Sequence, residues 1–176
     1  AALPISTGKP FSVLATDEPF VDPFGLPRQR GIHHAPFLIT SAKFKEFHIT
    51  IDDKSKTELN LKSENATIEL SKNASLKALA NAIDLKCDLY EKSNATIEGD
   101  VTNANIRLDN SSTLKGNKLT VKNADVTTEG NSNCSLFVET NIIVEAVDKS
   151  EIEILGAPKI EIRKFEGEAK LLKKLK

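Results

Sequence analysis

The segment Asn103-Ala104-Asn105-Ile106-Arg107-Leu108 contains the unit that decides the fold: a small polar pair, then a short strand with alternating apolar residues. The unit recurs from about Thr57 to Arg163, and its strand cores are Ile68-Glu69-Leu70, Ile83-Asp84-Leu85, Ile97, Ile106-Arg107-Leu108, Leu119-Thr120-Val121, Leu136-Phe137-Val138, Ile142-Ile143-Val144, Ile152-Glu153-Ile154 and Ile160-Glu161-Ile162. Each strand is too short to bury a core alone, so it needs stacked neighbours. The pattern therefore predicts a solenoid of β-strands.

The spacing of equivalent positions gives the length of one coil. Three interleaved series repeat every 18 to 25 residues: Asn81, Asn103 and Asn123; Ile97, Leu119, Ile142 and Ile160; and Leu89, Leu114, Leu136 and Ile154. Three series predict three strands in each coil, which is the plan of a three-sided parallel β-helix. We expect an all-β fold with about five to six coils, in a β-helix domain that spans residues 44–165.

The asparagines of the predicted turns form a column, because Asn81, Asn103 and Asn123 precede corresponding strands. Stacked Asn amides can hydrogen-bond to one another at the strand spacing, and Asn tolerates left-handed turn geometry. The predicted turns repeat the order Asn, small residue, Ser or Thr. This order produces five matches to the N-glycosylation pattern, at Asn65, Asn73, Asn94, Asn110 and Asn133. We attribute these matches to the turns rather than to glycosylation.

The composition fits a narrow aliphatic core and excludes several functions. Hydrophobic residues make up 39% of the chain and aromatic residues 5%. The net charge of −1 offers no bulk attraction to nucleic acid or to an anionic membrane. No apolar run approaches the length of a membrane span. The chain begins at Ala1 without Met, which fits removal of an export signal, and residues 166–176 are predicted to form a basic, solvated tail.

The first 43 residues have a different composition, with six of the seven prolines and four of the eight phenylalanines. Proline at this density breaks helices and central strands, whereas aromatic residues argue against plain disorder. We predict an extended arm whose turn residues space large apolar groups. Its candidate partner-binding anchors are Phe20, Phe24, Leu26 and Phe37. Two arrangements remain open: the arm lies along the repeat domain, or it docks on another protein.

Cys87 and Cys134 are expected to remain free thiols. They lie 47 residues apart, which is close to two coils. Because stacked strands are about 4.8 Å apart, two coils separate them by roughly 9–10 Å, beyond the limit of about 7 Å between the Cα atoms of a disulfide. We therefore predict two small buried residues.

The segment from Asp148 to Lys164 combines a small-residue turn, a short strand, the step Gly156-Ala157-Pro158 and one more strand. This order resembles the closing segment of the putative auto-transporter adhesin, head GIN domain family, a domain of unknown function in Bacteroidetes envelope proteins. The turns Ser93-Asn94-Ala95-Thr96 and Asn103-Ala104-Asn105-Ile106 are similar to the Ser-Gly-Ala-Ser turns of that family, with Asn in place of Gly.

The resemblance covers about Phe44 to Lys174 and implies a parallel β-helix, export, and a binding or adhesive role. The chain departs from the family pattern in two features: glycine is scarce at the turns, and the amino-terminal arm has no counterpart in that pattern.

Signatures of catalysis and of cofactor binding are absent from the sequence. It has neither a glycine-rich nucleotide loop nor a Gly-x-Ser-x-Gly elbow. The carboxylates with positions nearest to those of a carbohydrate-active β-helix enzyme are Asp84, Asp88, Glu98 and Asp100, which read as outward strand positions or turns. We therefore predict no enzyme activity and no cofactor.

A metal site is also not predicted. His33 and His34 are neighbours on an extended segment, so their side chains point apart. Calcium binding at turns such as Asp52-Asp53 or Asp109-Asn110 stays open.

These observations predict a non-catalytic scaffold that is exported to the periplasm, the outer membrane or the cell surface of a bacterium. We expect it to bind a protein or glycan partner through its strand faces and its arm. One alternative is a self-assembling structural protein of the envelope, because open coil ends offer unpaired strand edges. A carbohydrate-processing β-helix enzyme is a further alternative.

Overall fold

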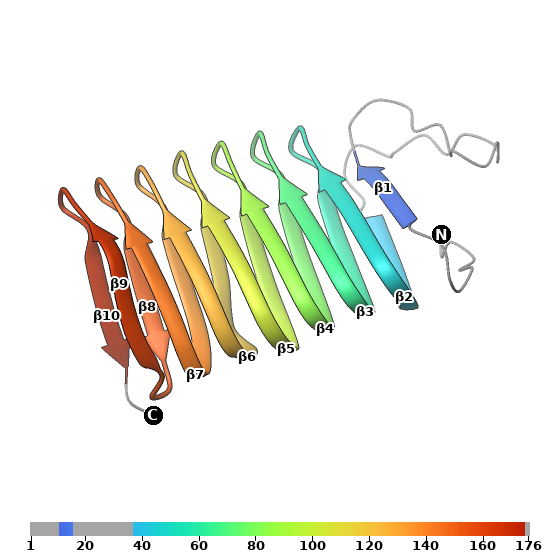
Figure 1. Ribbon diagram of the computed structural model, residues 1–176. Coiled ribbons are helices and arrows are strands. Elements are labelled where there is room, and N and C mark those ends of the chain that lie inside the picture. Colours follow the sequence, from blue (N-terminus) through green and yellow to red (C-terminus); the bar gives the residue numbers. More distant parts are fainter. Residues whose placement is uncertain (1–10, 16–36, 175–176) are drawn as a thin grey trace.

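The computed structural model describes residues 11–15 and 37–174, and every regular element among them is a strand (Figure 1). The strands are β1 (Phe11–Ala15), β2 (Phe37–Ile51), β3 (Lys56–Leu70), β4 (Ser75–Leu89), β5 (Asn94–Leu108), β6 (Thr113–Thr128), β7 (Asn133–Ala146), β8 (Glu151–Leu155), β9 (Lys159–Phe165) and β10 (Lys170–Lys174). Each pairs in parallel with the corresponding strand of the adjacent coil. The predicted all-β, parallel β-helix fold is confirmed.

One coil is 18 to 20 residues long. Equivalent residues along one corner of the solenoid, Asp84, Asn103, Asn123 and Asn141, are separated by 19, 20 and 18 residues. The described residues make about seven turns, slightly more than the five to six that the sequence predicted. The difference arises because the coil is shorter than the average spacing of the series and because β2 already begins at Phe37.

The core is a column of aliphatic side chains inside the coils. In β3, Leu59 and Leu61 point inward before the corner, and Ile68 and Leu70 point inward after it. The alternation breaks at Glu64-Asn65, where two consecutive residues are exposed and the strand turns the corner. Complete burial of one Leu or Ile side chain contributes about 1.5–3 kcal/mol, so the stacked columns supply the main stabilisation.

Four of the turns that close the coils have a backbone rarely adopted without glycine, at Asp53-Lys54, Lys72-Asn73, Glu91-Lys92 and Asn110-Ser111. In the turn Ser71–Ala74, Lys72 and Asn73 have φ of 47° and 65°, and the next turn places Glu91 and Lys92 at 50° and 64°. Two consecutive positive φ values are the signature of a type I′ turn. The N–H of Ala74 donates to the carbonyl of Ser71 at 3.0 Å, and the N–H of Asn73 donates to the carbonyl of Glu91 at 3.0 Å. Hydrogen bonds within and between the turns therefore offset the backbone strain.

A small residue ends each turn because its side chain enters the core at the tightest point of the coil. The fully buried members of this column are Ala74, Ser93, Ser112, Ser132 and Ser150, and Ser55 and Ala169 at its two ends are half-buried. The serine hydroxyls of this column differ in their hydrogen bonds. That of Ser112 donates to the carbonyl of Asp109 at 2.6 Å, whereas that of Ser132 has no partner among the described residues.

The register corrects the predicted asparagine column. Asn103 and Asn123 are neighbours, as expected, but Asn81 pairs with Asp100 instead, and Asp84 occupies the position beside Asn103. The error arose because Asn81-Ala82 repeats the letters of Asn103-Ala104 three residues before the corner of its own coil. The uniform spacing of 19 residues between the two coils, and not the local letters, sets the register.

Cys87 and Cys134 are free and buried, as predicted. They do not share one column, because Cys87 pairs with Ile68 and Ile106, whereas Cys134 pairs with Leu114 and Ile152. Burial raises the pKa of both thiols, that of Cys134 to about 12. Both cysteines therefore pack as small apolar residues.

The last full coil is divided into two strands. Gly156-Ala157-Pro158 separates β8 from β9, and both strands pair with β7. Pro158 lacks an N–H for the ladder, and Gly156 has a φ of 94° with its Cα close to the carbonyl of Val138. Beyond this coil, residues 170–174 of the predicted tail form β10, which pairs with β8.

Candidate binding surface

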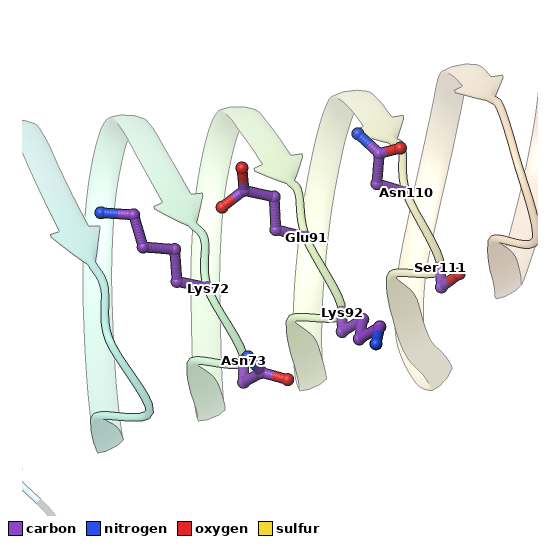
Figure 2. Close-up of a pocket in the computed structure, with 6 residues that line it drawn as sticks. All are labelled: Lys72, Asn73, Glu91, Lys92, Asn110 and Ser111. Atoms are coloured by element: carbon purple, nitrogen blue, oxygen red, sulfur yellow. The ribbon is translucent and has the colours of Figure 1, made fainter.

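A shallow, open depression lies over the turns of three consecutive coils (Figure 2). It has a volume of about 420 Å³. Its lining residues are Lys72, Asn73, Glu91, Lys92, Asn110 and Ser111. These are the positive-φ residues of three successive turns, so the turn backbone that closes each coil also points these side chains outward.

Electrostatics tie Lys72 to the preceding turn. Its ammonium lies 3.0 Å from a carboxylate oxygen of Asp52, and this hydrogen bond raises the pKa of Lys72. Burial alone would raise the pKa of Asp52, but hydrogen bonds from Lys72, from the hydroxyl of Ser71 and from the N–H of Asp53 lower it overall. The ion pair with Asp52 therefore fixes the side chain of Lys72 at the edge of the depression that faces the preceding coil.

The chemistry of this depression favours polar contacts rather than catalysis. Glu91 is the single carboxylate among its lining residues. Glycoside hydrolysis usually requires two carboxyl groups that face each other across the scissile bond. The two lysines and the amides instead offer hydrogen-bond donors to a polar ligand.

A second polar feature is the amide row, which we define as Asp84, Asn103, Asn123 and Asn141. The side-chain amide of each Asn donates to the preceding coil, with distances of 2.8, 3.1 and 3.0 Å, and the carboxylate of Asp84 accepts the first of these bonds. Asp84, Asn103 and Asn141 are exposed, and Asn123 is half-buried. An Asn amide has two N–H groups and two lone pairs on its oxygen, so each keeps hydrogen-bonding capacity toward solvent. The row therefore presents polar groups at the spacing of the coils.

The carboxylates weighed as enzyme candidates are spread over separate parts of the solenoid. Asp88 is nearly buried and pairs with Lys86 at 3.0 Å, and Glu98 pairs with Lys118 at 3.2 Å. Asp84 belongs to the amide row, and Asp100 lies beside Asn81 and Thr120 in the register. Side chains of the same coil or of the next coil therefore supply partners for three of them, and the four do not converge.

The turns considered for calcium use their carboxylates locally. Asp52 accepts hydrogen bonds from Asp53, Ser71 and Lys72, and Asp109 accepts one from the N–H of Asn110 at 2.6 Å. Over residues 45–174, no group of three or more His, Cys, Asp and Glu side chains is placed to hold a metal ion.

Of the predicted anchors, Phe20, Phe24 and Leu26 lie outside the described residues, and Phe37 is the first residue of β2. The turn depression and the place of Asp84 in the amide row were missed from the sequence. Aligning Ser71-Lys72-Asn73-Ala74 with Tyr90-Glu91-Lys92-Ser93, 19 residues later, would have revealed both.

None of the described residues forms a helix that is long and apolar enough to cross a membrane.

Comparisons with known proteins agree with this architecture. The family model described as putative auto-transporter adhesin, head GIN domain, matches residues 26–158. The chain is also similar in fold to a crystal structure described as a putative lipid binding protein from Parabacteroides distasonis ATCC 8503, with a TM-score of 0.52 and 16% identity. That match covers 77% of this chain and 61% of the other, so the chain spans less than two thirds of that structure. No curated protein matches the sequence.

Proposed function

The chain belongs to the putative auto-transporter adhesin, head GIN domain family, and from this premise we propose that it is a non-catalytic binding scaffold of the bacterial envelope. Its proposed location is the periplasm, the outer membrane or the cell surface. Its proposed partner is another envelope protein or a surface glycan. The contacts would come from the outer strand faces, the turn depression, the amide row and the amino-terminal arm.

The observation that carries this proposal is the regular polar surface of the coils. The amide row repeats one hydrogen-bonding group per coil over four coils, and the depression repeats the same backbone turn over three. Neighbouring coils are about 4.8 Å apart. Such a surface suits a ligand that also repeats, such as a glycan chain or an extended peptide, because many weak polar contacts can form together.

The arm is proposed as the source of apolar contacts. Phe20, Phe24 and Leu26 are large apolar residues spaced by Pro, Gly and Asp, and aromatic anchors of this kind dominate the energetics of many interfaces. The polar coils would then give specificity and the arm would add affinity.

The geometry gives less support to the two alternatives. A carbohydrate-processing enzyme needs two convergent carboxyl groups, whereas Asp88 is paired with Lys86 of its own coil and Glu98 with Lys118 of the next coil. A self-assembling protein needs strand edges that accept a copy of the same chain. Strands β9 and β10 instead carry several lysines, and charged side chains at an edge oppose strand pairing between copies.

The experiment is a binding screen with the full chain. The immobilised protein is probed with an array of surface glycans and with purified envelope proteins, and the affinity of each hit is measured. Two sets of substitutions separate the proposed contacts: Phe20→Ser with Phe24→Ser tests the arm, and Asn73→Ala with Asn110→Ala tests the depression. Asn131→Ala, at an exposed position in the turn between β6 and β7, outside the strand faces and both substituted surfaces, is the matched control.

We expect the arm variant or the depression variant to weaken binding by about tenfold or more, since loss of a well-packed anchor costs about 1.4 kcal/mol or more. The control is expected to bind as the unaltered chain does. Two results would contradict the proposal: turnover of a glycan substrate by the purified chain, or concentration-dependent filaments in light scattering.

A further inference from the structure

The carboxy-terminal end of the described solenoid has two strand edges. Strand β9 pairs with β7 and strand β10 pairs with β8, and neither has a second neighbour among the described residues (Figure 1). Each edge therefore presents a row of backbone N–H and C=O groups that another extended segment can pair with.

Among residues 45–174, no strand covers the apolar core at this end. The core columns run from Val144 to Ile162 and from Ala146 to Phe165. The exposed fraction is 0% for Val144 and Ala146, but it is 53% for Ile162 and 42% for Phe165 in the next coil. Of the five large hydrophobic residues exposed over residues 45–174, Ile162, Phe165 and Leu172 belong to these two strands. A further coil would cover the inward-facing pair as each coil covers the one before it.

In a third core column, which contains Leu136 and Ile154, the last residue is a lysine. Lys173 pairs with Ile154, which is fully buried, and Ile154 pairs with the equally buried Leu136. Lys173 is exposed and, like Lys159 and Lys170, makes no ion pair with any residue from 45 to 174. Arg163, Lys164 and Lys174, in contrast, are paired with acidic residues. Unpaired cations therefore surround the open core.

We propose that this end binds an extended acidic segment of a partner protein, which adds to β10 as a further strand. The backbone edge would supply the hydrogen bonds, as in other cases of strand addition. Apolar residues of the segment would cover Ile162 and Leu171, and its carboxylates would face Lys170 and Lys173. This site is separate from the arm and from the polar faces of the proposed function.

The charge at this end selects among the possible occupants. A second copy docked end to end would bring its own Lys170 and Lys173 against the same lysines, which is unfavourable. An anionic membrane would attract the lysines, but its hydrocarbon cannot satisfy the bare N–H and C=O groups of the edges. An acidic extended peptide satisfies the charge, the backbone and the apolar column together.

The test uses the full chain and two short synthetic peptides, one with the repeat Glu-Val-Glu-Glu, which places carboxylates opposite Lys170 and Lys173 and Val opposite Leu171, and one with Lys in place of each Glu. Binding is measured by fluorescence anisotropy at low and at high salt, and phosphatidylglycerol vesicles are tested in parallel. Amide hydrogen exchange then locates the bound peptide. Lys173→Glu and Lys170→Glu are the informative variants, and Lys77→Glu, an exposed strand lysine of β4, is the matched control.

We expect the acidic peptide to bind and the basic peptide not to bind. Each informative variant should weaken binding by about tenfold, and added salt should weaken it as well. Exchange protection should appear in β9 and β10 when the acidic peptide is added, with β4 to β6 unchanged.

Three outcomes would overturn the proposal. The first is protection, before any peptide is added, of the β9 and β10 amides that do not donate to β7 or β8, which means that another segment or another copy already covers this end. The second is binding of the vesicles in place of the acidic peptide. The third is equal binding by the unaltered chain and both charge-reversed variants.

Discussion

The side chain of Asn123 joins two coils from the outside, because its amide donates a hydrogen bond to Oδ1 of Asn103 at 3.1 Å while its own Oδ1 accepts one from Asn141 at 3.0 Å. Asn123 is therefore the central member of the amide row. Its side-chain hydrogen bonds add to the backbone hydrogen bonds that already join β6 to β5 and β7. Aligned amides of this kind polarise one another, so the row acts as a unit.

Removal of the central amide of the row should destabilise the folded protein. We expect Asn123→Ala to lower the free energy of unfolding by about 1 kcal/mol, because two side-chain hydrogen bonds are lost but their partners remain open to water. The measurement is urea denaturation followed by circular dichroism. Asn105→Ala, an exposed asparagine of β5 outside the row, should change the free energy by less than about 0.5 kcal/mol. Equal effects of the two substitutions would show that the row contributes nothing.

Gly99 has no room for a side chain between its own coil and the preceding one. It has a φ of 120°, and a Cβ at this position would overlap the carbonyl oxygen of Ala80. We expect Gly99→Ala to destabilise the fold by about 3 kcal/mol or more, because backbone must move to relieve the overlap. Thermal unfolding measures this loss.

Gly130→Asn is the control for a glycine with a left-handed backbone but with free space. A Cβ at Gly130 would meet its nearest atom at an ordinary 3.4 Å, and Asn110 adopts a similar positive φ in the preceding turn. We expect a change within about 1 kcal/mol. A large loss for Gly130→Asn together with a small loss for Gly99→Ala would contradict this interpretation of the coil spacing.

The two cysteines should report on unfolding. Because burial raises the pKa of Cys87 and Cys134, both remain neutral thiols in the native state at neutral and mildly alkaline pH. We expect a thiol reagent at pH 8 to label them only as fast as the coils open, and to label both at once in denaturant. Mass spectrometry of the labelled protein provides the measurement.

The same pKa shifts predict a loss of stability at high pH. In the unfolded chain the thiols ionise near their ordinary pKa of 9.0, whereas the folded protein keeps them protonated. The unfolded state therefore releases protons first, and the thiols' contribution to stability is lost as the pH rises above about 9. Replacing both cysteines with Ala should flatten this part of the pH profile. An unchanged slope would show that the thiols do not cause it.

Asp52 should produce a pH effect of the opposite sign. Its pKa in the folded protein lies below the ordinary value of 3.8, so the folded state resists its protonation. The stabilisation is present above about pH 4 and is lost as the pH falls toward the lowered pKa. We expect Asp52→Asn to reduce the dependence of stability on pH between about pH 4 and pH 2. Asp100→Asn, on another face, controls for the loss of one charge. A steep acid transition that persists in Asp52→Asn would assign the effect to other carboxylates.

The sequence was sufficient to predict the class of fold because the apolar alternation survives in nearly every coil. Ile106 and Leu108, for example, point inward as their pattern requires. The register was harder, because turns that look alike in letters, such as Asn81-Ala82 and Asn103-Ala104, occupy different positions in their coils. Backbone pairing over the whole strand decides the register, and a local motif does not contain that information.

The binding surface was less predictable than the fold. The depression is built from Lys72, Glu91 and Lys92, which are ordinary surface residues in the sequence and become neighbours only through the coil period. Strand β10 was not predicted for a related reason. Lys170 and Lys173 give its sequence the composition of a solvated tail, whereas its backbone pairs with β8. Composition describes such segments poorly when their partners come from an earlier coil.

The backbone geometry shared by four consecutive turns has a consequence for how the molecule can vary. Because Ser71–Ala74 and Tyr90–Ser93 share one backbone geometry and 19 residues separate them, a whole circuit can be inserted or deleted without altering the junctions on either side. Each insertion would lengthen the rod by about 4.8 Å. The length of the solenoid can therefore change in steps of one coil.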